Sequence, residues 1–291
     1  MCGSRSRSGW RPIRALEGDD GVARAIKHIK AGLLHVEVIG TVPESAPGRR
    51  RSGRCRPTSA AQQFYNDKCS WRELELLLAA NYGRGDYVAT FTFDDEHLPP
   101  DKDGAGKYVD KFIRKLRAVR RKRGQELRYV YVTEGWHGKA EDEYFGGDGR
   151  LEDRRLHLHM VLNGVGPGDL EEIRSLWPGG GYVRIEPVEV HYYRELAKYL
   201  TKEAREFGRT RPGEHTWHAS RNLEKYEVEY IEIPSDSVTL SPPPGAVDYV
   251  QFSERNPYGY ADCIGARYLL FETEDPPAYS YAKGRKPKKK K

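Results

Sequence analysis

Residues 156–163, with the sequence LHLHMVLN, limit the possible folds of this chain more than any other stretch. Successive side chains of a β-strand point to opposite faces, so His157 and His159 would share one face while four apolar side chains share the other. This alternation predicts a strand with one face against a hydrophobic core. Two imidazoles at positions i and i+2 can bind one metal ion, although two hydrogen-bonded structural histidines would show the same spacing.

Strand and helix patterns alternate on both sides of this strand. Their order, β-α-β-β-α-β-α, predicts an α+β fold with a ferredoxin-like or RRM-like open antiparallel sheet and two helices on one face. A helix capped by Ser70 and Glu73 is expected before it, and β-rich additions after residue 208. The expected strands are 31–42, 87–93, 127–133, 155–163 and 182–190, and the expected helices are 70–81, 106–123, 169–177 and 192–207.

Composition divides the chain into four parts. A basic, partly disordered N-terminal extension (1–62) contains an arginine-rich loop at 43–56. A nickase-sized domain (63–210) carries the histidine strand. A β-rich extension (211–275) and a disordered Lys-rich tail (276–291) complete the chain.

The charge balance indicates a polyanionic partner, with nucleic acid first. The chain has 49 Lys and Arg against 43 Asp and Glu, a net charge of +6 and a pI of about 9.0. No stretch approaches the length of a membrane span, so no membrane partner is expected. Four scattered cysteines without a C-x-x-C pair are typical of a reduced, cytoplasmic protein. The basic side of the helix at 106–123 supplies candidate DNA contacts: Arg114, Lys115, Arg117 and Arg121.

Glu134 is the natural third metal ligand. It ends a predicted strand of the same sheet, and alternation places it on the face of Val130 and Val132. Two imidazoles and a carboxylate suit Mg²⁺ or Mn²⁺, and Zn²⁺ would accept them too. Asp94 and Asp95, which follow the first strand of this region, are rival ligands.

Tyr199 is the candidate nucleophile. On a helical wheel it lies about 100° from the centre of the apolar stripe of its helix, and Lys202 lies one turn later on the same side. Flanking positive charge from Lys198 and Lys202 favours the ionised form of a phenol. A phenolate beside a metal ion can attack a phosphodiester, although a tyrosine that packs at a domain edge would give the same pattern.

Taken together, these motifs resemble the HUH endonuclease superfamily over roughly residues 87–207. The His-Leu-His strand is preceded by Thr90-Phe91-Thr92-Phe93 and followed by a helix with Tyr-x-x-Lys, the order seen in rolling-circle replication initiators. Within the superfamily the chain looks most like the initiators of single-stranded DNA phages and related plasmids. Asn163-Gly164 and Ser220-Arg221-Asn222-Leu223 fit that group, and Arg221 joins the candidate DNA contacts.

The resemblance implies a metal-dependent DNA endonuclease and strand transferase. His157, His159 and Glu134 would bind the metal, and Tyr199 would form a 5′-phosphotyrosine and leave a 3′-OH. Lys202 would orient the phosphate. One nucleophile is expected, because Tyr192 lies seven residues away rather than in a close pair. No Gly-Lys-Ser/Thr phosphate loop occurs, so a host helicase and polymerase would act with it on origin single strands in a bacterial host. The alternatives are a related transposase or relaxase, and a non-catalytic RRM-like nucleic-acid-binding protein.

Overall fold

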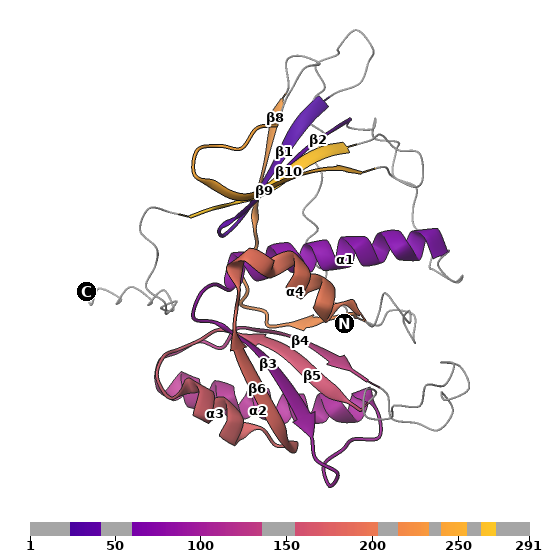
Figure 1. Cartoon of the computed structure of the whole chain (residues 1–291). Coiled ribbons are helices and arrows are strands. Elements are labelled where there is room, and N and C mark those ends of the chain that lie inside the picture. The colour runs from indigo at the N-terminus through magenta and orange to yellow at the C-terminus, as the bar shows by residue number, and fades with distance from the viewer. Residues whose placement is uncertain are drawn as a thin grey trace, which may run out of the picture. The chain divides into compact units, whose positions relative to one another are not determined.

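The computed structural model describes residues 24–41, 60–135, 155–202, 215–232, 240–254 and 263–271. Parts of the sequence predictions lie outside these ranges: the arginine-rich loop at 43–56, the tail at 276–291 and the helix end at 203–207. The described residues form two compact units, each with an antiparallel sheet of five strands (Figure 1). The α+β fold class expected from the sequence is confirmed.

The unit that contains the histidines has the strand order β6-β3-β5-β4-β7. Its first four strands have the order of a split β-α-β fold, in which β5 lies between β3 and β4 and is antiparallel to both. The short β7 adds a fifth strand beside β4. The strands are β3 (Tyr87–Phe93), β4 (Tyr129–Glu134), β5 (His157–Leu162), β6 (Gly180–Pro187) and β7 (His218–Ala219).

Helices cover both faces of this sheet (Figure 1). α2 and α3 lie on one face, as predicted, and α4 lies on the other beside α1, with which it makes its main contacts. A short 3-10 turn, η2 (Val190–Tyr192), leads into α4. The helices are α1 (Ala60–Asn81), α2 (Lys102–Lys122), α3 (Asp169–Leu176) and α4 (Tyr193–Leu200).

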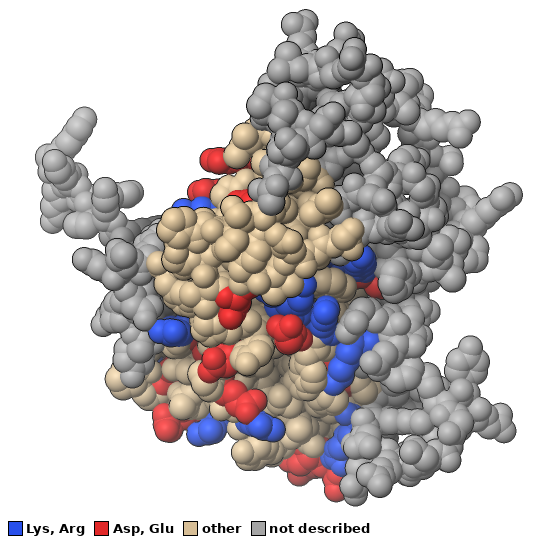
Figure 2. Space-filling model, turned by 45° about the horizontal axis from the view of Figure 1, so that its top comes forward, with Lys and Arg blue, Asp and Glu red and all other residues tan. Residues whose placement is uncertain are grey.

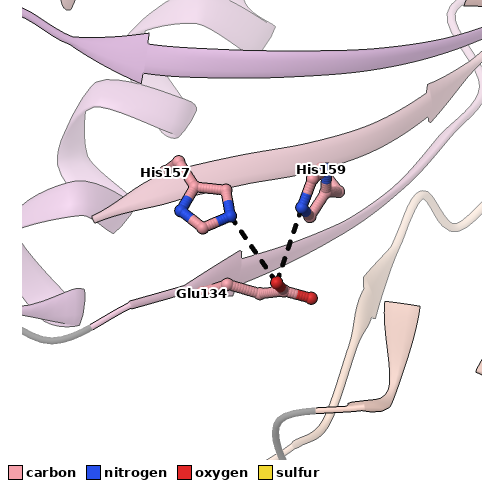
Figure 3. A group of neighbouring side chains, drawn as sticks. All are labelled: Glu134, His157 and His159. Atoms are coloured by element: carbon pink, nitrogen blue, oxygen red, sulfur yellow. Dashed lines mark ion pairs between the residues drawn. The ribbon is translucent and has the colours of Figure 1, made fainter. Parts of the chain in front are cut away.

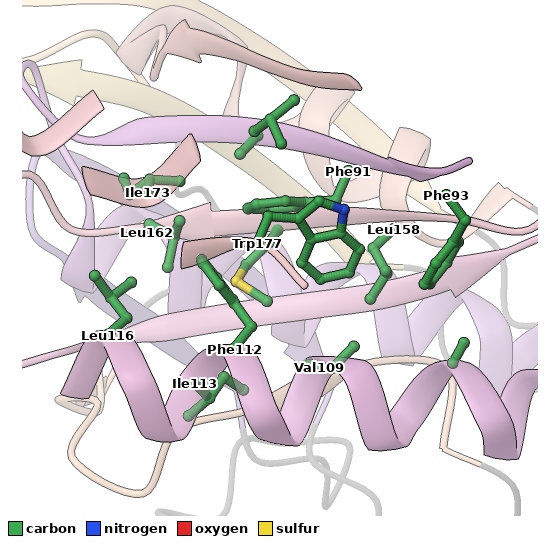
Figure 4. Close-up of a cluster of buried hydrophobic side chains, with 14 of the residues drawn as sticks. Phe91, Phe93, Val109, Phe112, Ile113, Leu116, Leu158, Leu162, Ile173 and Trp177 are labelled. Atoms are coloured by element: carbon green, nitrogen blue, oxygen red, sulfur yellow. The ribbon is translucent and has the colours of Figure 1, made fainter. Parts of the chain in front are cut away.

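The core lies between the sheet and α2 (Figure 4). Trp177 packs against Phe91 and Phe112, with ring centroids 4.8 and 5.7 Å apart. Leu158 and Met160 of β5 are fully buried in the same cluster. The apolar side of the histidine strand therefore faces α2, and the histidines face the opposite layer.

Several predicted boundaries are wrong by a few residues or more. α1 begins at Ala60, ten residues before the expected cap at Ser70. α2 begins after Asp101, whose side chain accepts a hydrogen bond from the Gly104 backbone N–H. β6 ends at Pro187, since proline has no N–H to donate within a sheet.

The other unit consists of strands from both sides of the first one in sequence, a grouping that the sequence did not predict. Its sheet has the order β8-β1-β2-β10-β9. Residues 31–42, expected as one strand, instead include a turn at Gly32, where φ is +57°, between β1 and β2. The strands are β1 (Arg24–Ala31), β2 (Leu34–Thr41), β8 (Glu227–Glu232), β9 (Ala246–Glu254) and β10 (Cys263–Leu270).

Candidate metal and nucleophile site

Adjacent strands bring a carboxylate and two imidazoles together. In the antiparallel pair of β4 and β5, Glu134 lies directly opposite His157, and Val132 lies opposite His159. The three side chains therefore share the face that α4 covers, as the alternation predicted. Glu134 Oε2 lies 3.5 Å from Nε2 of His157 and 3.5 Å from Nε2 of His159 (Figure 3).

These separations fit the binding of one metal ion. Two ligand atoms that are each about 2.1 Å from an ion lie about 3.0 to 3.4 Å apart at octahedral or tetrahedral angles. The three ligand atoms all lie within 4.8 Å of one another. In addition, Glu134 Oε1 is buried and accepts no hydrogen bond from the described residues. This unsatisfied acceptor and the two imidazoles fit a divalent cation.

Hydrogen bonds orient both imidazole rings. His157 Nδ1 lies 2.9 Å from the Arg155 carbonyl oxygen, and because a carbonyl only accepts, this nitrogen carries the hydrogen and Nε2 faces Glu134. His159 Nδ1 lies 3.0 Å from Thr90 Oγ1 on the neighbouring strand β3. Metal-bound histidines are usually held by such a bond on the second ring nitrogen.

The site has a strongly favoured carboxylate. Burial opposes ionisation of Glu134, but hydrogen bonds from His157, His159 and Lys202 and the charge of His159 outweigh it, so the pKa of the carboxyl is well below its usual range. Burial alone would lower the pKa of His157, yet its hydrogen bond to Glu134 raises the pKa above its ordinary value. Glu134 is therefore a negatively charged ligand at neutral pH.

Tyr199 and Lys202 lie at the same site. Tyr199 Oη is 3.0 Å from His159 Nε2, and the side chain is 43% exposed, so the phenol reaches the triad and solvent together. Lys202 Nζ is 3.0 Å from Glu134 Oε2 and 4.0 Å from the centre of the Tyr199 ring. Burial would lower the pKa of Lys202, but the hydrogen bond and charge of Glu134 raise it, so the ammonium group keeps its proton.

Packing between α1 and α4 fixes the direction of Tyr199. Tyr193, Ala197 and Leu200 form the buried side of α4, which leaves Tyr199 outside the apolar stripe, as the helical wheel predicted. On α1, the indole of Trp71 lies 5.2 Å from Lys198 Nζ. Lys198 thus packs beside Trp71, one residue before the candidate nucleophile.

The rival ligands point to other partners. Asp94 Oδ1 accepts hydrogen bonds from the backbone N–H and the ring of His97, and Asp95 pairs with Arg155 at 2.6 Å. Tyr192, in the turn before α4, is 59% exposed.

Other predicted DNA contacts lie away from the triad. Arg221 follows β7 beside the start of β4, whereas Glu134 is at the end of β4. The remaining four, which are exposed on α2, lie on the opposite side of the sheet from the histidines: Arg114, Lys115, Arg117 and Arg121.

Two residues of the site region were not assigned a role from the sequence. Thr90 was noted within the Thr-Phe-Thr-Phe strand, but its bond to His159 depends on the register of β3 against β5. Trp71 was only part of a predicted helix. Its place beside Lys198 depends on contacts between helices more than a hundred residues apart, for which the sequence has no local signal.

Comparison with known proteins points to replication. The sequence model of a family described as replication-associated protein, of the ORF2 type, matches residues 86–204, which is less than half of the chain. No curated protein and no solved structure matches the chain. Within the described residues, no helix is long and apolar enough to cross a membrane. The matched segment is therefore similar to a replication initiator family, and it contains Glu134, both histidines, Tyr199 and Lys202.

Proposed function

We propose that this chain is a replication initiation endonuclease that nicks single-stranded origin DNA through Tyr199 and later rejoins the ends, as in rolling-circle replication. The observation that carries the proposal is the 3.0 Å distance between Tyr199 Oη and His159 Nε2, which brings a partly exposed phenol to a candidate metal site. The match of residues 86–204 to replication-associated proteins supports the same process. The proposal thus places the chain in the single-tyrosine HUH group.

In this mechanism Glu134, His157 and His159 would hold Mg²⁺ or Mn²⁺. When bound, such an ion supplies Lewis-acid polarisation of the scissile phosphate. Lys202 keeps its proton beside Glu134, so its ammonium group can balance negative charge that grows on the phosphate oxygens. Exposure of Tyr199 leaves room for a DNA strand to approach the phenol.

The chemical step is a transesterification. The bond between Tyr199 Oη and phosphorus forms as the bond between phosphorus and the 3′ oxygen breaks, and the proton lost by the phenol balances the one gained by the 3′ oxygen. The products are a 5′-phosphotyrosine and a free 3′-OH that can prime synthesis. Attack of a 3′-OH on the phosphotyrosine reverses the step and rejoins DNA.

The partners follow from this role. The substrate would be single-stranded DNA at an origin in a bacterial cytoplasm, and a host helicase and polymerase would unwind and copy the duplex.

Adduct formation tests the proposal. The full chain is incubated with Mn²⁺ and labelled single-stranded oligonucleotides that tile its origin region, and covalent protein–DNA adducts are detected on denaturing gels. We expect an adduct with the unaltered chain, none with Tyr199→Phe, and loss of metal-dependent cleavage with His157→Ala. Tyr192→Phe is the matched control, because it removes a hydroxyl from an exposed tyrosine seven residues away and should leave the adduct intact.

Each alternative gives a different result. An adduct that persists in Tyr199→Phe and disappears in Tyr192→Phe would assign the wrong nucleophile. Oligonucleotide binding without any adduct, with or without Mn²⁺, would favour a non-catalytic nucleic-acid-binding protein. Preference for transposon ends or a conjugative transfer origin would favour a transposase or relaxase.

A further inference from the structure

The exposed side of α2 is almost entirely basic. At about 100° per residue, seven Lys and Arg side chains fall within an arc of roughly 160° that lies opposite the buried side of the helix. The buried side consists of Ala105, Val109, Phe112, Ile113, Leu116 and Arg120. The basic arc, which we call the α2 basic face, comprises Lys107, Lys111, Arg114, Lys115, Arg117, Arg121 and Lys122, all of them exposed.

Little negative charge offsets this face. Between Lys107 and Lys122 the only acidic residue of α2 is Asp110, and Arg114 bonds to its backbone carbonyl rather than its carboxylate. Among the described residues, no acidic side chain pairs with Lys107, Lys111 or Lys122. By contrast, on the face of the molecule in Figure 2, basic and acidic side chains lie close to one another. A solvated helix usually mixes the two signs, so this single-sign face favours an anionic ligand.

The α2 basic face and the candidate catalytic site lie on opposite sides of one sheet. α2 packs against Leu158 and Met160, while His157 and His159 point to the layer of α4. A strand segment bound at Tyr199 therefore does not lie on α2. The anion that α2 binds must be another segment of nucleic acid or a separate molecule.

We propose that the α2 basic face binds the phosphate backbone of double-stranded DNA without reading its sequence. Duplex DNA has one charge per about 1.7 Å of its axis, and the seven cations extend over about 22 Å of a straight helix. Single-strand binding would need exposed rings for base stacking. On this helix Phe112 is buried and Tyr108 packs against Phe93, and the nearby Tyr129 ring lies beneath Arg117 at 6.0 Å.

The test compares two charge-matched variants of the full chain. Lys111→Gln/Lys122→Gln removes two cations from the α2 basic face and keeps good helix formers, while Lys30→Gln/Lys225→Gln removes two exposed lysines elsewhere. Binding to a labelled duplex of arbitrary sequence, and to one of its strands alone, is measured by fluorescence anisotropy over a series of NaCl concentrations in EDTA. Circular dichroism checks that both variants are folded.

We expect the α2 variant to bind the duplex about tenfold more weakly, with the slope of log K against log[NaCl] reduced by about 1 to 2. The control variant should keep the slope of the unaltered chain. Equal losses in both variants would show only a general charge effect, and a loss confined to the single strand would assign α2 to single-stranded DNA; either result overturns the proposal. Because EDTA removes metal and no cleavage is scored, the result does not depend on whether Tyr199 forms an adduct.

Discussion

At the scale of single residues, the hydroxyl of Thr90 decides which nitrogen of His159 faces the triad. Thr90 Oγ1 lies 3.0 Å from His159 Nδ1, on the strand directly beside β5. If the ring donates its Nδ1–H to this oxygen, Nε2 keeps its lone pair for a metal ion or for the Tyr199 hydroxyl. Thr90 is therefore a positioning residue, which acts through His159.

Thr90→Val should weaken metal binding, because it keeps the branched shape but removes the acceptor for His159 Nδ1. We expect the Kd for Mn²⁺, measured by titration calorimetry or electron paramagnetic resonance, to rise about 10- to 100-fold. Thr90→Ser should restore most of the affinity. Thr92→Val is the matched control, since Thr92 is on the same strand and face but its hydroxyl donates to the Tyr182 carbonyl. Equal Kd values for the Thr90→Val and unaltered chains would contradict this role.

The sequence predicted the positions of the three candidate ligands but not of their supports. His157, His159 and Glu134 follow from the alternation of side chains along a strand, which depends only on local geometry. Thr90 and Lys202 contact these ligands across elements 69 and 68 residues away from His159 and Glu134, counted along the chain. Such contacts depend on strand register and helix docking, for which neighbouring residues hold no signal.

At the scale of elements, Arg120 fixes α2 to β5 and α3. Its side chain is fully buried and donates two hydrogen bonds to the Asp169 carboxylate and two to oxygens of Asn163. Asn163 Oδ1 in turn accepts from the Arg128 backbone N–H. The residue after the histidine strand, which the resemblance associated with replication initiators, thus has a structural role here.

Arg120→Met should destabilise the unit strongly. The substitution keeps the length of the side chain but leaves the buried Asp169 carboxylate without its charge partner. We expect the free energy of unfolding to fall by about 3 to 5 kcal/mol, measured by urea denaturation with tryptophan fluorescence. Adding Asp169→Asn should recover part of the loss, because the unpaired charge is then absent.

Arg121→Met is the control for this prediction. It changes the exposed neighbour in the same helix and should alter the free energy of unfolding by no more than about 0.5 kcal/mol. If Arg120→Met and Arg121→Met are equally stable, the buried network does not fix these elements.

Periodicity located most elements near the histidines, with errors where signals are not local. β3 has the bounds that its β-prone sequence predicted, and α3 ends within one residue of its expected end. Ser70 and Glu73 match a capping box, yet they lie inside α1 because the chain before them is also helical. A cap signal shows that a helix can start at a residue, whereas packing decides whether it starts earlier.

At the scale of the whole molecule, the chain closes one unit from segments that flank the other. Val38 of β2 pairs with Gly265 of β10, so the two strands meet across 227 residues of sequence. No local pattern indicates such a pairing, which is why the strands before residue 42 and after residue 226 were not predicted to form one sheet. Long-range pairing of this kind is slow, because loop closure precedes any stabilising contact. The unit with the histidines is nearly continuous in sequence and does not have this delay.

Truncation tests whether the two units fold separately. A chain of residues 58–226 contains every strand of the histidine sheet, so we expect it to fold and to bind Mn²⁺ with the affinity of the full chain. A chain that lacks only residues 1–57 should keep that affinity too, but β8 loses β1, its one neighbour in the sheet. Amide hydrogen exchange should then show β8 unprotected while β3 and β5 stay protected. Loss of Mn²⁺ binding in the 58–226 chain, or protection of β8 without β1, would show that the two units depend on each other for folding.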